Sequence, residues 1–195
     1  VREVSGELSA PLPVVHDIAG PEVRTAPLDE PIHVDAGSTV RFVADDDATP
    51  EEIGLSMSIS AVEPGDRVLL DDGRIETTVE AVDGETVVAH VEDGGELGGR
   101  KGVNVPGVDL DLPTITDQDR RELEVAVEKE VDFVAASFVR DGEDVYEIGK
   151  HIDDLGGDIP IIAKIERTGA VDNLDSIIDE AYGIMVARGD LGVEC

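Results

Sequence analysis

Three charged side chains follow two apolar runs near the end of the chain. Lys164 and Glu166 close the β-branched run 159–165, and Asp190 follows the run 183–187. The first run is typical of a strand that is buried on both faces, and the second is also interpreted as a strand. A helix is predicted between them from apolar residues spaced three and four apart, at Val171, Leu174, Ile177 and Ile178. Two successive parallel strands would bring the charged groups to one edge of a sheet, the edge that carries the active site in β/α barrels.

These residue types fit one kind of chemistry. Two carboxylates from neighbouring strand ends can hold Mg²⁺, which prefers few carboxylates and leaves its other positions to water and substrate oxygens. A lysine beside them could stabilise the charge on a transferring phosphoryl group or on an enolate. The alternative is a purely structural rim of ion pairs, and spacing alone leaves both interpretations open.

The same residues carry a resemblance to a known family. The segment IIAKIERTGAV, followed by GIMVARGDLGVE, closely resembles the active-site signature of the pyruvate kinases. The resemblance implies that Lys164 is catalytic and binds substrate, and that Glu166 and Asp190 hold Mg²⁺, or Mn²⁺ in its place. It also implies that the backbone N–H groups of Arg188, Gly189 and Asp190 bind the substrate carboxylate.

A second match lies near the start of the chain. The apolar run 12–15 is interpreted as a barrel strand with His16 and Asp17 at its end, and Gly20-Pro21 as a turn. The segment after it resembles the family's Asp-Thr-Lys-Gly-Pro-Glu-Ile-Arg-Thr, with Ile18 and Ala19 in place of the threonine and lysine. The resemblance implies that Asp17 and the backbone carbonyl of Ile18 bind K⁺, and that Arg24 contacts the nucleotide phosphates. Ala19 removes a positive charge that the family usually has.

Residues 23–110 have a different pattern from the rest of the chain. Short alternating apolar stretches are separated by Gly, Asp and Pro turns, and the runs 75–82 and 86–91 flank an Asp-Gly hairpin signal. This pattern predicts a small β-barrel or sandwich. The segment 71–73, Asp-Asp-Gly, is interpreted as a turn rather than a metal site. The resemblance identifies the region as the family's inserted lid, with Lys101 at the position of a lysine that contacts ATP.

Strands and helices alternate from residue 111 onward. Thr116 is predicted to cap a helix that ends near 130, and strand 133–138 is followed by a helix at 141–155. The expected fold is therefore α/β, a partial (β/α)₈ TIM barrel with an inserted all-β lid. The expected domains are a barrel segment at 1–22, the lid at 23–110 and the continued barrel at 111–195. An open partial barrel would leave apolar strand faces uncovered.

Composition limits the possible partners. The 46 acidic and 15 basic residues give a formal net charge of -31, which argues against nucleic acid and anionic membranes. A folded protein from a salt-adapted, halophilic organism is expected, because salt screens such self-repulsion. With a single cysteine, Cys195, which we expect to be incidental, no disulfide can form within the chain. These features are compatible with the cytoplasm.

The resemblance implies a glycolytic pyruvate kinase, which transfers the phosphoryl group of phosphoenolpyruvate to ADP and is usually a homotetramer. We expect this chain to be a piece of such an enzyme and doubt that it turns over alone. Three alternatives stay open: a Mg²⁺-dependent aldolase or lyase of the phosphoenolpyruvate/pyruvate barrel superfamily, a non-catalytic nucleotide-binding module, and an incomplete fragment without function.

Overall fold

A computed structural model describes residue 6 and residues 12–194, so Cys195 lies outside the described residues. The chain divides into two compact units. One is formed by the segment that ends at Pro21 together with Pro113–Leu191, and the other by Glu22–Leu112 together with the segment that begins at Gly192. Among the described residues, no helix has both the length and the apolar character that crossing a membrane requires.

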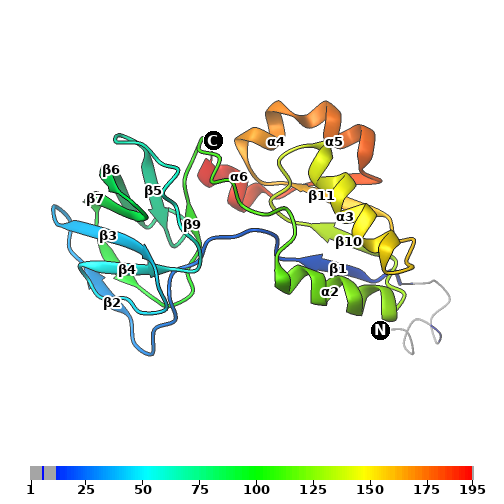
Figure 1. The fold of residues 1–195 in the computed structure, drawn as a ribbon, viewed down its shortest axis with the longest axis horizontal. Coiled ribbons are helices and arrows are strands. Elements are labelled where there is room, and N and C mark those ends of the chain that lie inside the picture. The colour runs from blue at the N-terminus through cyan, green and yellow to red at the C-terminus, as the bar shows by residue number, and fades with distance from the viewer. Residues whose placement is uncertain (1–5, 7–11, 195) are drawn as a thin grey trace. The chain divides into compact units, whose positions relative to one another are not determined.

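The first unit is built on a four-stranded parallel sheet in the order β1-β10-β11-β12 (Figure 1). Its strands are β1 (Val15–Ile18), β10 (Phe133–Ala136), β11 (Ile161–Ile165) and β12 (Gly183–Val186). The helices that follow them are α2 (Asp117–Glu128), α3 (Gly142–Asp154), α4 (Thr168–Asp172), α5 (Leu174–Glu180) and α6 (Arg188–Glu194). Helices and parallel strands therefore alternate from α2 onward, as predicted.

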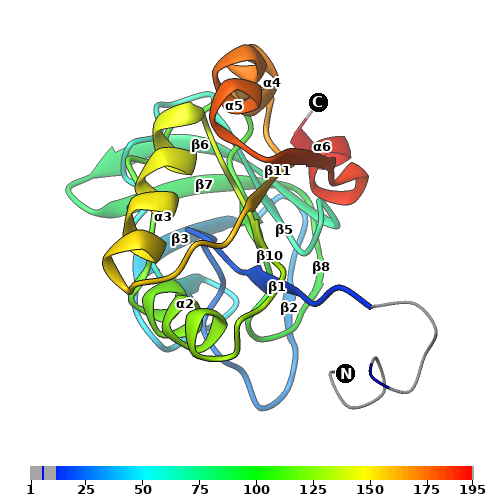
Figure 2. The same cartoon turned by 90° about the vertical axis from the view of Figure 1, so that its right-hand side faces the viewer.

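Local sequence explains where α2 and α3 begin. The Thr116 side chain accepts from the Asp119 backbone N–H, and the Asp119 carboxylate accepts from the Thr116 backbone N–H, which completes a capping box. The Asp141 side chain caps α3 by accepting hydrogen bonds from the backbone N–H groups of Glu143 and Asp144. The predicted cap at Thr116 is confirmed. Figure 2 shows α2 and α3 side by side, and both contribute buried residues to one core with the strands.

Strand β1 corrects the first prediction. It covers Val15–Ile18 rather than 12–15, because its register pairs Val15 with Phe133 and Ile18 with Ala136 of β10. Pro13 has no N–H to donate to such a ladder, while the Val14 N–H donates to the Asp132 carboxylate at 2.7 Å. His16 and Asp17 therefore lie within the strand rather than beyond its end.

Burial in the last β-α-β segment also differs from the prediction. The expected helix is broken at Asn173 into α4 and α5, and Val171 and Ile178 are exposed while Ile177 is fully buried. Strand β11 alternates between buried and half-buried residues, and β12 exposes Ile184, Met185 and Val186. The reason is position: β12 is an edge strand of the described sheet, so its apolar face is uncovered, as expected for an open partial barrel.

The second unit is a β-structure. A six-stranded sheet has the order β4-β3-β7-β6-β5-β9, and β2 pairs with β8 in a two-stranded sheet. The strands are β2 (Ile32–Val34), β3 (Thr39–Ala44), β4 (Glu52–Leu55), β5 (Arg67–Leu70), β6 (Ile75–Asp83), β7 (Thr86–Asp93), β8 (Gly95–Leu97) and β9 (Val103–Asn104). The predicted hairpin is confirmed as β6–β7, where Asp83 pairs with Thr86 and Gly84 takes a positive φ of 63° in the turn.

Candidate functional site

Lys164 is the centre of a polar cluster at one face of the parallel sheet. Its Nζ lies 2.9 Å from Ser137 Oγ, 3.1 Å from Glu166 Oε1 and 3.3 Å from Asp17 Oδ1. The Ser137 hydroxyl donates in turn to Asp17 Oδ1 at 3.3 Å. Strands β1, β10 and β11, together with the residues directly after β10 and β11, thus supply the contacts of this cluster.

The strand register explains this meeting. Asp17 pairs with Ala135, and Ala135 pairs with Ile162. Side chains two residues apart on a strand lie on the same face, so Ser137 and Lys164 extend along the face that Asp17 occupies. The opposite face of β11, with Ile161, Ala163 and Ile165, packs into the helix-covered core.

Lys164 remains charged in this setting. Burial by itself would lower the pKa of Lys164, but the negative charges of Glu166 and Asp17 outweigh burial and raise the pKa above its ordinary value. The Lys164 side chain is 16% exposed and that of Glu166 only 1%, whereas that of Asp17 is 61% exposed. The cluster is therefore a fixed ammonium between a buried carboxylate and a solvent-facing one.

Glu166 is held by the backbone as well as by Lys164. The Phe138 N–H donates to Glu166 Oε2 at 2.7 Å. Phe138 has a φ of 56°, a left-handed conformation that is uncommon for a bulky residue. The guanidinium carbon of Arg167 lies 4.8 Å from the centre of the Phe138 ring, within the range of a cation–π contact. Such strain at a buried carboxylate is typical of a functional loop.

The loop after β10 is anchored by a partly buried ion pair. Arg140 contacts both carboxylate oxygens of Asp144 at 2.8–2.9 Å, and the Thr114 hydroxyl donates to the same carboxylate at 2.7 Å. Burial alone would raise the pKa of Asp144, but the bonds from Arg140 and Thr114 outweigh it and lower that pKa. Arg140 thus fixes the loop that presents Ser137 and Phe138.

The loop after β1 is fixed by close packing. Gly20 has a φ of 69°, and a Cβ built on it would lie 2.5 Å from the Ser137 carbonyl oxygen, so only glycine fits there. Its N–H donates to the buried Asp119 carboxylate at 3.0 Å. The cap of α2 therefore also holds the backbone that follows Asp17.

A second polar cluster lies within the β-unit. Arg24 donates to Glu22 Oε2 at 2.6 and 3.0 Å and to the Arg100 carbonyl at 2.9 Å. Lys101 Nζ lies 2.9 Å from Asp71 Oδ1. The two basic residues come from neighbouring segments, because Arg24 forms a bridge with Gly102 and the Thr25 N–H donates to the Lys101 carbonyl at 2.8 Å.

Comparison with known proteins shows the family of this chain. The sequence model of the pyruvate kinase barrel domain matches residues 1–195. The chain belongs to the pyruvate kinase family. It is 40% identical over its full length to a pyruvate kinase of Clostridium acetobutylicum and 41% identical to one of Bacillus licheniformis, covering 42% and 34% of those proteins. It is also 40% identical, over 93% of its length, to plastidial pyruvate kinase 2 of Arabidopsis thaliana, of which it covers 32%.

Membership of the pyruvate kinase family explains the architecture. The four parallel strands with their helices are part of a barrel, so the predicted α/β partial barrel is confirmed. The chain spans less than half the length of these curated relatives.

The residues expected to bind Mg²⁺ follow two neighbouring strands of the parallel sheet. Glu166 follows β11, and Asp190 lies in the first turn of α6, which begins at Arg188 directly after β12. Within the described part of the chain, no group of three or more His, Cys, Asp or Glu side chains is arranged as a metal site. A two-carboxylate donor set still fits Mg²⁺, because each carboxylate oxygen of Glu166 has one protein donor and a carboxylate has about four acceptor positions.

The remaining predicted residues occupy distinct positions. Ile18 is the last residue of β1 and its side chain is buried in the core, so only its backbone is available to a cation. Arg188 and Gly189 are exposed at the start of α6. Nothing in the structure explains what replaces the missing lysine at Ala19.

Sequence patterns alone do not identify every residue of the two clusters. They indicate only a supporting role for Ser137, Phe138 and Arg140, since core packing accounts for such residues equally well. They also place Asp71 in a turn without indicating that it is the partner of Lys101. The positive φ of Asp71 and the contact of Phe138 with Glu166 arise from tertiary structure, so no local signal identifies them.

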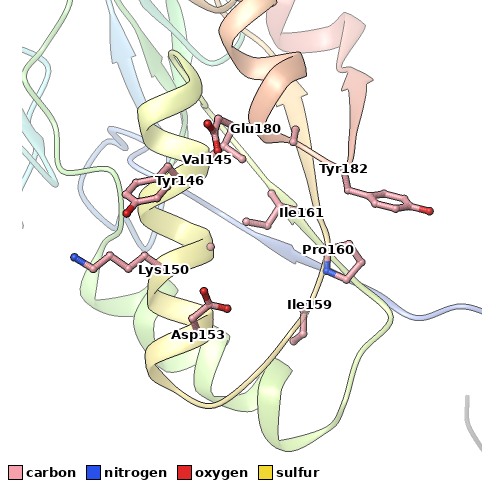
Figure 3. Close-up of a pocket in the computed structure, with 11 residues that line it drawn as sticks. Val145, Tyr146, Lys150, Asp153, Ile159, Pro160, Ile161, Glu180 and Tyr182 are labelled. Carbon is pink, nitrogen blue, oxygen red and sulfur yellow. The ribbon is translucent and has the colours of Figure 1, made fainter.

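A hollow on the outer side of the barrel segment is separate from both clusters. It has a volume of about 470 Å³ and lies between α3 and the residues that precede β11 and β12 (Figure 3). Tyr146, Lys150 and Tyr182 line it, and Tyr182 points outward from the ribbon. None of its lining residues belongs to the Lys164 or the Lys101 cluster, so it adds no group to either one.

Proposed function

We propose that the protein carrying this chain is a pyruvate kinase that converts phosphoenolpyruvate and ADP into pyruvate and ATP in glycolysis. The observation that carries the proposal is the Lys164 ammonium, fixed within hydrogen-bonding distance of Ser137, Glu166 and Asp17. In the reaction the phosphorus–oxygen bond of phosphoenolpyruvate breaks while a terminal oxygen of ADP bonds to phosphorus. The enolate that remains takes a proton at its methylene carbon and becomes pyruvate.

Lys164 would stabilise the charge on the phosphoryl group in transit and on the enolate. A fixed ammonium in a partly buried site acts at low reorganisation cost, which is the main source of such electrostatic stabilisation. Glu166 and Asp190 would hold Mg²⁺ or Mn²⁺, which supplies a Lewis-acid centre for the substrate oxygens when bound. Asp17 and the Ile18 carbonyl would hold K⁺.

The backbone N–H groups of Arg188, Gly189 and Asp190 would bind the substrate carboxylate, and Arg24 and Lys101 the nucleotide phosphates. In this proposal the β-unit, at about 23–110, is a lid inserted between barrel segments 1–22 and 111–195. Closing a lid excludes water from the reacting groups. The complete enzyme would be a cytoplasmic homotetramer, without nucleic acid or membrane as a partner.

The test is pyruvate formation by the intact gene product in molar KCl with Mg²⁺. We expect pyruvate to form only when phosphoenolpyruvate and ADP are both present, with ATP in equal amount. An aldolase or lyase would instead turn over without ADP, although the match of the whole chain to the pyruvate kinase family disfavours that alternative. If the protein bound ADP but formed no pyruvate, it would be a non-catalytic nucleotide-binding module, and the proposal would be overturned.

We also propose that the protein is adapted to high salt. At a net charge of -31, its surface carboxylates repel one another over a Debye length of about 30 Å at 0.01 M salt but only about 3 Å at 1 M. We therefore expect the folded chain to unfold when it is dialysed from molar KCl into dilute buffer. Circular dichroism measures the loss of secondary structure. Sucrose provides the control because it stabilises without screening charge, and it should not replace KCl. A fully folded protein at low salt would contradict the proposal.

A further inference from the structure

Lys101 has a carboxylate partner in Asp71. Asp71 Oδ1 lies 2.9 Å from Lys101 Nζ, and Asp71 Oδ2 lies 3.2 Å from Arg74 Nη1. The Asp71 side chain is only 9% exposed, whereas that of Lys101 is 38% exposed. The pair therefore joins a buried anchor to an ammonium that solvent can reach.

The backbone aims Asp71 at this lysine. Asp71, Asp72 and Gly73 follow β5 directly and have φ values of 51°, 58° and 79°, all in the left-handed region. Aspartate and asparagine tolerate this region better than most residues. The Asp71 N–H donates to the Gly102 carbonyl at 3.1 Å, which fixes the turn against the segment that carries Lys101.

Two further contacts restrict the conformation of Lys101. The Lys101 N–H donates to Thr25 Oγ1 at 2.9 Å, which sets the start of its side chain. A Cβ built on Gly98 would lie 3.1 Å from Lys101 Cε, so the chain passes close to the lysine stem at Gly98. A lysine side chain on a surface samples many rotamers, but here its stem and its ammonium are both restricted.

Asp71 is ionised in this environment. The hydrogen bond from Lys101 is the main influence on the Asp71 carboxyl, and with the charge of Arg74 it outweighs burial and lowers the pKa of Asp71. A buried carboxylate without such partners would be costly, so the ion pair is the arrangement that the fold favours.

We propose that Asp71 is the positioning residue for Lys101: it fixes the ammonium where the phosphates of the nucleotide arrive. This inference rests on the proposed function, in which Lys101 binds those phosphates. An ammonium has three N–H donors, so one can bond Asp71 while the others face an incoming phosphate oxygen. Fixing the lysine beforehand removes the cost of ordering it when the nucleotide binds.

Simple charge effects predict the opposite outcome, which makes the proposal testable. Removing a carboxylate next to a phosphate site should tighten nucleotide binding, because ADP is an anion. If Asp71 positions Lys101, removing its charge should instead weaken nucleotide binding. Asp71→Asn is the variant of choice, since asparagine keeps the shape and tolerates the left-handed backbone. Asp72→Asn is the matched control, because Asp72 is exposed in the same turn and the change in charge is identical.

The experiment measures the ADP affinity of the intact protein in molar KCl with Mg²⁺. We expect Asp71→Asn to weaken ADP binding about 3- to 10-fold, the cost of ordering one long side chain. Asp72→Asn should stay within about twofold. Lys101→Met should weaken binding about 10- to 100-fold, and adding Asp71→Asn to it should cause no further loss, because Asp71 acts only through Lys101. Phosphoenolpyruvate affinity should not change in Asp71→Asn or in the Lys101→Met/Asp71→Asn double variant.

The possible results separate the two proposals. If Lys101→Met leaves ADP binding unchanged, the nucleotide role of Lys101 fails, and the inference fails with it. If Lys101→Met weakens binding but Asp71→Asn does not, the nucleotide role stands and only the positioning role is overturned. If Asp71→Asn does not fold, Asp71→Glu replaces it: the charge is kept but the carboxylate moves by one methylene, and an unchanged ADP affinity would overturn the inference.

Discussion

We expect Lys164→Met to lower the rate of pyruvate formation by the intact enzyme about 10²- to 10³-fold, the usual effect of removing one electrostatic stabiliser of a transition state. The loss should appear in kcat. Methionine approximates the length of the lysine stem but supplies neither the charge nor the N–H donors that reach Ser137, Glu166 and Asp17. The measurement is steady-state turnover in molar KCl with saturating phosphoenolpyruvate and ADP.

Two controls accompany this variant. Lys150→Met makes the same chemical change at an exposed position on α3 and should keep full activity. Mn²⁺ affinity should be retained in Lys164→Met, because no oxygen ligand is removed and one positive charge near the metal is lost. Turnover above about a tenth of the wild-type rate would contradict the proposed role of Lys164.

The second large effect concerns the metal. We expect the chain to bind one Mn²⁺ tightly in molar KCl, and Glu166→Gln/Asp190→Asn to weaken that site by more than about 100-fold, beyond the loss typical of a supporting residue. Glu166 is already fixed by Lys164 and by the Phe138 N–H, so its carboxylate is oriented before a metal arrives. Calorimetric or spectroscopic titration measures the affinity and the number of sites.

Diffuse binding to an acidic surface must be separated from this site. At a net charge of -31, many carboxylates attract Mn²⁺ weakly, so only the difference between variants counts. Asp45→Asn/Asp46→Asn removes the same two charges from an exposed loop and should keep the tight site. Equal binding by the wild type and the Glu166/Asp190 variant would show that these two residues are not the ligands in this chain.

Tertiary structure changed several local predictions for a single reason. Apolar pattern identifies which segments form strands, but pairing decides where each strand begins and which of its residues are buried. Thus β1 starts at Val15 because of its register with β10, and β12 is exposed because it lies at the sheet edge. Asn173 divides the last predicted helix, and Val171 and Ile178 are left outside the core.

The amino-acid sequence by itself determined the alternation of strands and helices from residue 111 onward, the β6–β7 hairpin, the cap at Thr116 and the resemblance at 161–171 and 183–194 that names the family. These signals are local, because they depend on residue type and on spacings of a few positions. Only the tertiary structure decided that Lys164 meets Asp17, 147 residues earlier in the chain, that Phe138 donates to Glu166, and that Asp71 holds Lys101. Such contacts depend on strand register and on left-handed turns that bring distant segments together, and no short pattern in the sequence encodes them.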